Sequence, residues 1–318
     1  MNTLCPPLAR GRGAFPAGIR FLAGLLLLLT LVTGGCASSS ARAPGPRRPL
    51  YAITAPTAEE LAAFETIALT TSPRIVSLRH NGVEFRRTEI AGRDCLLFVS
   101  GMSMVNAAMT AQLAADRFPV THLLALGAAG GVNPTRDRGD VVVAARWHYH
   151  SEATYLNPQP SGDGWILPPG FTPKLPNFGM IFPESVSATQ LGASAPEPMA
   201  AFPADPGLVA AATKVATDRS EEILATRWPR IVVGGSGVSG PVFVDNREYR
   251  AWLYRVWQAE VVDMESTALA QVCWANRIPF VAVRVVGDLA GSGPLAPSKP
   301  VLPAAAKTLY AMLQLMPP

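Results

Sequence analysis

The chain has few cysteines, few charged residues and no apolar segment long enough to cross a membrane. Only four of its 318 residues are cysteine, and 16% are charged. Cys5 and Cys36 lie near the N-terminus, so Cys95 and Cys273 alone cannot supply a disulfide framework. These two stand in apolar segments, where a free cysteine usually acts as a small buried hydrophobe. The apolar run at residues 21–33 has 13 residues, too few to span a bilayer stably.

Acidic residues are absent from the first 50 residues, which hold six arginines. Subtracting these six from the 27 basic residues leaves 21, against 23 acidic residues, so residues 51–318 carry a net charge of −2. The overall charge of +4 therefore comes from the leader and does not indicate a nucleic-acid surface. No Gly-Lys-Ser/Thr follows the glycine-rich segment, which excludes a Walker phosphate loop.

Residues 1–35 have the pattern of an export signal, with arginines before the apolar run and small residues at its end. The ending Thr-Gly-Gly-Cys resembles a bacterial lipobox, although Thr33 stands where a leucine is usual, and Cys36 would be the lipidated residue. An ordinary cleaved signal peptide is the alternative. Residues 36–49 are rich in Ser, Pro and Arg and predict a flexible tether. We therefore expect a lipid-anchored protein of the bacterial cell envelope, on the periplasmic side, with the outer membrane as one candidate site.

Residues 50–318 are enough for one α/β domain with a sizeable core. Apolar runs alternate with helical periodicities, which favours a single domain with a central mixed, largely parallel sheet flanked by helices. Asn81-Gly82 predicts a hairpin turn, and Asp205 and Asp245 are predicted helix caps. Strands are predicted near 50–54, 74–78, 84–90, 95–100, 123–126, 141–145, 231–233, 261–262 and 280–286, and helices near 57–69, 105–118, from 206, 245–257, 264–276 and 304–315.

Residues 157–206 differ in composition from the rest of the domain, because they hold 11 prolines in 50 residues. A loop of this length inside a compact domain is usually functional or disordered. We expect an irregular insertion that runs over the surface.

Two carboxylates stand at the ends of neighbouring predicted elements. Glu265 lies at the start of the helix 264–276, and Asp288 follows the apolar strand 280–286. In sheets of alternating strands and helices, ligands bind at the carboxyl ends of the strands. Two carboxylates there suit acid and base chemistry on a polar small molecule, including cleavage of an N-glycosidic bond.

The stretch from Val261 to Gly291, with most of residues 51–305, resembles the nucleoside phosphorylase/nucleosidase superfamily, in particular its methylthioadenosine/S-adenosylhomocysteine nucleosidases. The resemblance implies an N-ribosyl hydrolase acting on purine nucleosides, with adenine nucleosides such as these two as expected substrates and with no cofactor. The run PVFVDNREYRAWLY is similar to the plant bark storage proteins and their bacterial relatives. Homodimers are common among the nucleosidases, so a homodimer is one candidate assembly.

The resemblance also implies a role for each matching residue. Asp288 would protonate the leaving base, Glu60 would activate the attacking water, and Glu265 would accept hydrogen bonds from the ribose hydroxyls. The other expected substrate contacts are the residue before Glu265, the aromatic residue of PVFV, the arginine of the last strand and the glycine-rich turn: Met264, Phe243, Arg284, Gly127 and Ala128.

Each of these roles has a structural alternative. Glu60 stands three residues after Thr57, which is the spacing of a capping box, and the two roles are compatible. Glu265 could serve only the helix dipole, and Asp288 could cap the next turn. Ordinary packing or ion pairing is the alternative for Met264, Phe243 and Arg284.

His148 and His150 flank Tyr149 with strand-like spacing, which could form half of a metal site. No convincing set of Cys, Asp or Glu completes it in the sequence. We therefore interpret both histidines as structural and predict no metal.

Three positions bear on the choice between hydrolysis, phosphorolysis and binding without catalysis. Phosphorylases commonly have an arginine before the glycine-rich turn to hold phosphate, and this chain has Leu126 there. That favours water as the nucleophile. Nucleosidases usually carry hydroxyls where this chain has Ala128 and Gly287, and each lost hydrogen bond costs about 0.5–1.5 kcal/mol. A nucleoside-binding or storage-like protein with weak catalysis is therefore the second hypothesis, and a purine nucleoside phosphorylase is the third.

Overall fold

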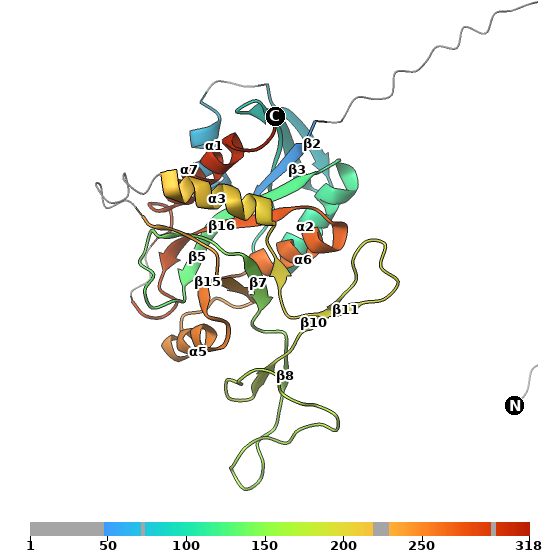
Figure 1. Cartoon of the computed structure of the whole chain (residues 1–318), viewed down its shortest axis with the longest axis vertical. Helices are drawn as coiled ribbons and strands as arrows, with labels where there is room; N and C mark the ends of the chain where they lie inside the picture. The colour runs from blue at the N-terminus through green and yellow to red at the C-terminus, as the bar shows by residue number, and fades with distance from the viewer. Residues whose placement is uncertain (1–47, 71–73, 219–228, 294–296) are drawn as a thin grey trace, which may run out of the picture. The chain divides into compact units, whose positions relative to one another are not determined.

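A twelve-stranded sheet forms the centre of the protein (Figure 1). The structure, a computed structural model, describes residues 48–70, 74–218, 229–293 and 297–318, and the expected signal, tether and Cys36 lie outside these ranges. The strand order is β12-β7-β14-β15-β5-β1-β4-β3-β2, with β16 beside β5 and β6, and β13 beside β6. Helices cover both faces, so the predicted α/β fold class is confirmed.

The centre of the sheet is parallel and buried. Strand β1 (Leu50–Ala55) pairs in parallel with β4 (Arg93–Val99) and with β5 (His122–Gly131), and β16 (Phe280–Asp288) pairs in parallel with β5. These strands read as nearly continuous apolar runs because helices cover both faces of a parallel sheet. Their carboxyl ends meet at one edge, where Glu60, Ala128 and Asp288 lie.

The glycine-rich segment is a strand and not the turn that we predicted. β5 continues to Gly131 because β16 pairs with it along its whole length, up to Asp288 opposite Gly130. On the other side, β15 (Ala259–Asp263) pairs with the end of β5 in antiparallel orientation. Backbone hydrogen bonds on both sides therefore hold this segment extended, in spite of its glycines.

The two ends of the sheet differ in how well the sequence predicts them. The hairpin of β2 (Val76–His80) and β3 (Val83–Ile90) turns at Asn81-Gly82, and both residues have positive φ, 47° and 82°. The predicted hairpin is thus confirmed. The sequence did not predict β7 (Arg146–Tyr149) or β14 (Ser236–Ser239), which are only four residues long. The short strands β6 (Val141–Val143) and β13 (Ile231–Val233) pair with each other.

Three layers are formed by the sheet and the helices on its two faces. α1 (Ala58–Ala68), α3 (Pro206–Asp218) and α7 (Leu302–Gln314) share one apolar core, and α2 (Met104–Arg117) and α6 (Ser266–Asn276) contribute to the core on the other face. A third cluster lies under α5 (Arg247–Trp257).

One predicted helix cap is right and the other is wrong by one residue. The backbone N–H of Leu208 donates to Asp205 Oδ1 at 2.9 Å, as expected at the start of α3. At α5 the cap is Asn246, whose Oδ1 accepts from the N–H of Tyr249 at 2.8 Å, and not Asp245. Asp and Asn cap helices about equally well, so their order in the sequence does not separate them.

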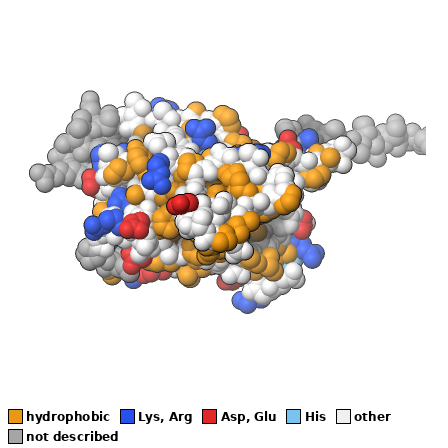
Figure 2. All heavy atoms as spheres, turned by 90° about the horizontal axis from the view of Figure 1, so that it is seen from below, with side chains coloured by type: hydrophobic (Ala, Val, Ile, Leu, Met, Phe, Trp, Pro, Cys, Tyr) orange, Lys and Arg blue, Asp and Glu red, His pale blue; other side chains and the backbone are white. Residues whose placement is uncertain are grey.

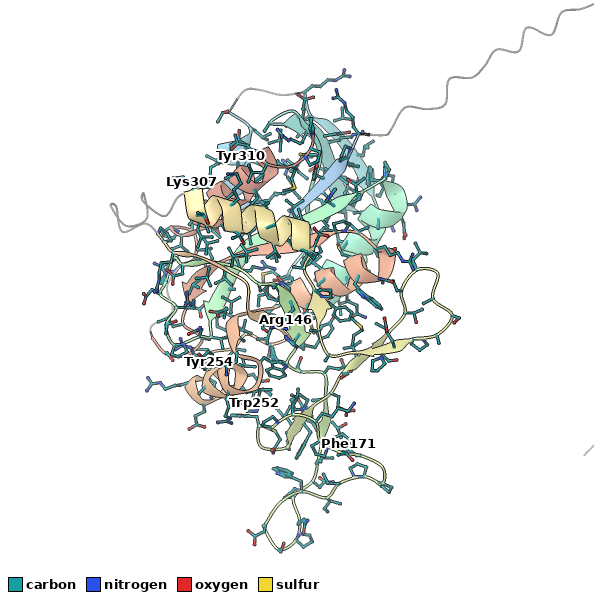
Figure 3. All side chains as sticks on the ribbon, viewed as in Figure 1. Arg146, Phe171, Trp252, Tyr254, Lys307 and Tyr310 are labelled. Atoms are coloured by element: carbon teal, nitrogen blue, oxygen red, sulfur yellow. The ribbon has the colours of Figure 1, made fainter. Side chains whose placement is uncertain are left out.

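The insertion at residues 157–206 projects from the sheet (Figure 1), and its contacts with the rest of the domain include helices α5 and α6. Pro176 accepts a hydrogen bond from Trp252 Nε1 at 3.0 Å, and the ring of Phe202 packs against Trp274. Figure 3 places Phe171 in the projecting part and Trp252 at its base. Short strands lie in and before this segment: β8 (Ala153–Tyr155) with β9 (Ile181–Pro183), β10 (Val186–Ala188) with β11 (Glu197–Met199), and β12 (Phe202–Pro203) beside β7.

Seen from the end at which the insertion projects, the protein carries many hydrophobic side chains on its surface (Figure 2). The insertion and the strand before it supply several that are about half exposed: Tyr155, Ile166, Leu167 and Met180. In the described ranges, no helix combines the length and apolar character needed to cross a bilayer. Cys95 and Cys273 are both free and buried.

Candidate active site

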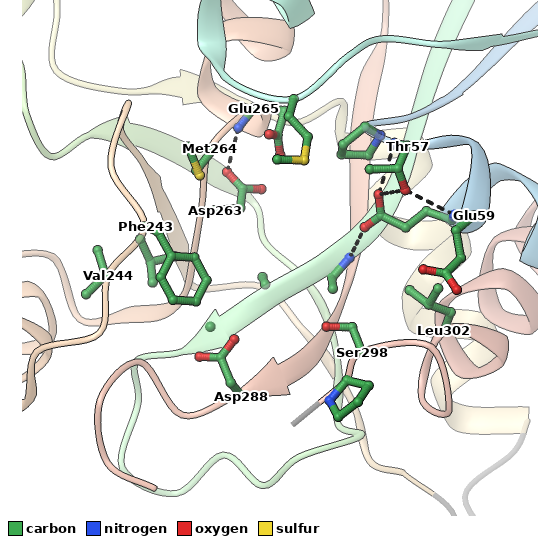
Figure 4. A pocket seen from close by; sticks show the side chains of 18 of the residues that line it. Thr57, Glu59, Phe243, Val244, Asp263, Met264, Glu265, Asp288, Ser298 and Leu302 are labelled. Carbon is green, nitrogen blue, oxygen red and sulfur yellow. Dashed lines mark hydrogen bonds between the residues drawn. The ribbon is translucent and has the colours of Figure 1, made fainter. Parts of the chain in front are cut away.

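A cavity of about 480 Å³ opens where the central parallel strands end (Figure 4). The start of α1, the end of β5, the β15–α6 junction, the connection at Val242–Val244 and the end of β16 all contribute to its wall. The expected residues Glu60, Ala128, Phe243, Met264, Glu265 and Asp288 all line it. Residues up to 228 positions apart in sequence thus meet at the edge where ligands bind in α/β sheets.

Glu60 is held by three hydrogen bonds in the wall of the cavity. Its Oε2 accepts from the backbone N–H and the hydroxyl of Thr57, at 3.1 and 2.8 Å, which completes the predicted capping box. Its Oε1 accepts from the backbone N–H of Ala128 at 2.8 Å. A carboxylate has about four acceptor positions, so one remains for a water or ligand in the cavity. Capping and a role in the cavity are therefore compatible.

Glu265 and Asp263 flank one buried guanidinium, that of Arg284. Nε of Arg284 lies 2.8 Å from Asp263 Oδ2 while it donates to the hydroxyl of Ser266 at 2.9 Å. Nη2 lies 3.6 Å from Glu265 Oε2. The Arg284 side chain is 0% exposed and does not line the cavity. Arg284 therefore does not make the expected contact with substrate. It instead pairs with the two carboxylates from outside the cavity.

Asp263 is a site residue that the sequence reasoning missed. Its Oδ1 accepts from the backbone N–H groups of Glu265 and Ser266, at 3.2 and 3.1 Å, and from the hydroxyl of Ser239 at 2.5 Å. It therefore caps α6, while Glu265, the residue at the cap position, makes no capping bond with its own side chain. The signal was present in the sequence, because Asp is a preferred residue just before a helix, where its side chain accepts from the N–H groups two and three residues on.

The carboxyl group of Glu265 is directed into the cavity by these neighbours. Its Oε1 accepts from the backbone N–H of Ser103, at the start of α2, at 2.9 Å. Burial raises the pKa of Glu265 to about 7, and the negative charge of Asp263 adds to this effect. Arg284 and the N–H of Ser103 act in the opposite direction but do not cancel it.

Asp288 stands at the end of β16, opposite Gly130 of β5 and directly after a register shift in their pairing. Its Oδ1 accepts from the backbone N–H of Ala290 at 2.8 Å, so it also caps the following turn. Met264 and Phe243 form an apolar wall beside it. Phe243 is 61% exposed and its ring points into the cavity, which excludes the core-packing alternative for this residue (Figure 4).

Gly127 lies behind the cavity and makes room for Arg284. A Cβ atom at this position would lie 2.2 Å from Arg284 Nη1 and 2.9 Å from Glu60 Oε1. Gly127 is not among the residues that line the cavity, so the expected direct contact with substrate is not what this position provides. Its neighbour Ala128 lines the cavity and donates its N–H to Glu60.

The charges around the cavity are mostly negative. Glu59, Glu60, Asp263, Glu265 and Asp288 line it, and among its described residues only Lys299 carries a positive charge. Nζ of Lys299 lies 3.3 Å from Glu59 Oε1, at the exposed rim. An excess of carboxylates favours a ligand that develops positive charge and opposes a phosphate dianion.

The two histidines interpreted as structural, His148 and His150, both have protein partners. Nδ1 of His148 pairs with the carbonyl of Ala200 at 2.8 Å, and Nδ1 of His150 pairs with the hydroxyl of Tyr249 at 2.9 Å. Over the described ranges, no three His, Cys, Asp or Glu side chains group in a way that could hold a metal ion.

The domain is similar to known proteins along most of its length. Residues 50–315 match the family model described as Phosphorylase superfamily. The 5'-methylthioadenosine/S-adenosylhomocysteine nucleosidase of Baumannia cicadellinicola is 31% identical over 202 residues, which cover 63% of this chain and 71% of that protein.

Solved structures show the same fold. Futalosine hydrolase of Helicobacter pylori matches with a TM-score of 0.61 and 20% identity, over 84% of this chain and 98% of that chain. The 5'-methylthioadenosine/S-adenosylhomocysteine nucleosidase of Colwellia psychrerythraea, solved in complex with adenine, matches with a TM-score of 0.60 and 23% identity, over 84% and 95% of the two chains.

The raised pKa of Glu265 predicts a pH-dependent effect of Glu265→Gln on stability. Because burial favours the protonated form, the stability associated with this group is fully present below its ordinary pKa and is lost as the pH rises through about 7. The variant cannot ionise, so its Tm relative to wild type should rise between pH 5 and pH 8. A gain on the order of 2 kcal/mol corresponds to about 4 °C or more. Thermal melting at both pH values measures it, with Glu59→Gln as the control for loss of a pocket charge. An equal Tm difference at both pH values would contradict the assignment.

Proposed function

Because the chain belongs to the phosphorylase superfamily, we propose that it is an N-ribosyl hydrolase that cleaves purine nucleosides. The expected substrates are adenine nucleosides such as 5'-methylthioadenosine or S-adenosylhomocysteine, on which relatives at about 30% identity are named to act. The observation that carries the proposal is the meeting of Glu60, Glu265 and Asp288 in one cavity whose other lining charges are mainly negative.

The reaction assigns one proton transfer to each of two carboxylates, Asp288 and Glu60. Water attacks C1′ of the ribose while the bond from C1′ to the base nitrogen breaks, and its electron pair leaves with the base. Asp288 donates the proton that the departing base needs, and Glu60 accepts the proton that the attacking water loses. The sugar has oxocarbenium character in the transition state, and the negative charge of the cavity stabilises it.

In this proposal Glu265 holds the ribose. A carboxylate can accept one hydrogen bond from each hydroxyl of a vicinal diol, and Glu265 lies with Met264 at the inner wall of the cavity. Asp263 and Arg284 fix its position, and the N–H of Ser103 occupies only one acceptor position of Oε1. Phe243 at the exposed side offers a ring face to the base.

Hydrolysis is favoured over phosphorolysis by the position of Leu126. This residue stands where an anion-binding arginine would be expected, and its side chain is fully buried in the core under α1 and α7. The one basic side chain among the described lining residues, Lys299, pairs with Glu59 at the rim. The likeness to plant bark storage proteins remains a prediction, and binding without cleavage is an outcome of the test below.

The test is release of free base by the purified, phosphate-free domain, residues 48–318, from adenosine, methylthioadenosine, inosine and guanosine. We expect release without phosphate, fastest for an adenine nucleoside, and no acceleration when phosphate is added. Asp288→Asn should lower kcat by at least about 100-fold, the usual contribution of a general acid, while nucleoside affinity changes much less. Release only with phosphate would establish a phosphorylase, and saturable binding without release would establish a binding protein. An equal loss of turnover and affinity in Asp288→Asn would contradict the role of Asp288.

We also propose that the protein is exported and lipid-anchored through Cys36 in the bacterial cell envelope. The support is the sequence alone: the basic, apolar and small-residue pattern before Cys36 and the tether after it. In a bacterial host, wild-type protein should incorporate labelled palmitate and fractionate with membranes. Cys36→Ser should lose both properties, and membrane association without label would argue against lipidation.

A homodimer is proposed on the basis of an apolar surface beside the cavity. Met102, Val105 and Met109 lie on and just before α2 and are 56%, 68% and 67% exposed. Met102 also lines the cavity. Analytical ultracentrifugation should give a dimer for the wild type and a monomer for Val105→Glu. A monomeric wild type at micromolar concentration would contradict the proposal.

A further inference from the structure

Gly287 lacks a side chain because another part of the chain fills the space beside it. A Cβ atom at this position would lie 2.6 Å from the hydroxyl oxygen of Ser298 and 3.4 Å from the Cβ of Ala128. Gly287 lies within β16 and is not among the glycines with positive φ. The backbone would therefore accept a side chain, but the Ser298 hydroxyl would have to leave its present position to make room for it.

Ser298 presents its hydroxyl to the cavity. It is one of the lining residues, and Figure 4 shows the hydroxyl directed toward the side on which Asp288 lies. The backbone carbonyl of Ser298 accepts from the N–H of Val301 at 2.9 Å. Among the described residues, the hydroxyl itself has no hydrogen-bond partner. A hydroxyl that can donate and accept is therefore available to a ligand.

Arg138 holds the segment that carries Ser298 against the end of β16. Its Nε donates to the carbonyl of Gly287 at 2.8 Å, and its Nη2 donates to the carbonyl of Pro297. One planar guanidinium thus joins the residue before Asp288 to the residue before Ser298. The fork geometry of arginine fixes the spacing of the two backbones, which a lysine could not do.

We propose that Ser298 is a substrate-positioning residue that hydrogen-bonds the purine base next to Asp288. This inference rests on the proposed function and deepens it, because it names a group that binds the base and that the sequence reasoning missed. Related nucleosidases usually have a hydroxyl at the position of Gly287. Here the hydroxyl of Ser298, in the connection between β16 and α7, lies beside that position instead. Arg138 is the residue that sets its position.

The test is a double-mutant cycle between positions 287 and 298, read as kcat/KM with an adenine nucleoside. Ser298→Ala should lower kcat/KM by about threefold to tenfold, the effect of one lost hydrogen bond, mainly through a higher KM. Gly287→Ser should also lower it, because the new side chain collides with the Ser298 hydroxyl. The double variant should recover to within about twofold of wild type, since its serine fills the space that Ser298 leaves.

Two further variants separate positioning from a general effect on folding. Ser292→Ala removes a hydroxyl from the same connection outside the cavity and should leave kcat/KM unchanged. Arg138→Ala should lower kcat/KM like Ser298→Ala, and the two changes should not add. Thermal melting of each variant monitors the fold.

Adenine affinity, measured by calorimetry, keeps this inference distinct from the proposed function. If the wild type releases base but Ser298→Ala matches Ser292→Ala in kcat/KM and adenine affinity, the role of Ser298 is wrong and the hydrolase stands. Additive losses in the double variant would also overturn it. If the wild type releases no base, the proposed function fails. In that case, weaker adenine binding by Ser298→Ala but not by Ser292→Ala supports the inference, and equal binding by the two variants overturns it.

Discussion

The site depends on one buried guanidinium, that of Arg284. Burying a charge is costly unless it is paired and hydrogen-bonded, and Arg284 meets this condition through Asp263, Glu265, Ser266 and the carbonyl of Leu126. These partners come from β15, α6 and β5. The ion pair therefore fixes the junction of three elements, and removing Asp263, whose carboxylate lies 2.8 Å from Nε, would leave the buried guanidinium without its nearest countercharge.

The position of the Arg284 side chain restricts which residue types can stand beside it. The guanidinium lies so close to β5 that only glycine fits at position 127. On the opposite side, Asp263 takes over both the pairing of Arg284 and the capping of α6. Because Asp263 caps α6, the side chain of Glu265 makes no capping bond, and its carboxyl group is directed to the cavity. The same buried network that stabilises the junction thus holds a largely buried carboxyl group at the wall of the cavity, where the proposed ribose would bind.

Much of the fold and part of the site could be predicted from local signals. The Asn81-Gly82 hairpin, the Thr57–Glu60 capping box and the positions of Glu265 and Asp288 at element ends each depend on a few neighbouring residues. The extension of β5 through its glycines could not be predicted, because pairing with β15 and β16 overrides the local tendency of glycine to form turns. Ser298 was missed for the same reason, since only the tertiary path of the chain brings it beside Gly287.

The charge balance of the cavity explains why a superfamily that includes phosphorylases can also contain a hydrolase. Phosphorolysis must bring a dianion beside a sugar that is becoming cationic, so it needs cations to offset the carboxylates that hold the sugar. Here the carboxylates line the cavity, the guanidinium of Arg284 is fully buried outside it, and the side chain of Leu126 lies in the core. A neutral water is the nucleophile that enters such a cavity at least electrostatic cost, and Glu60, the proposed base, lines the same cavity.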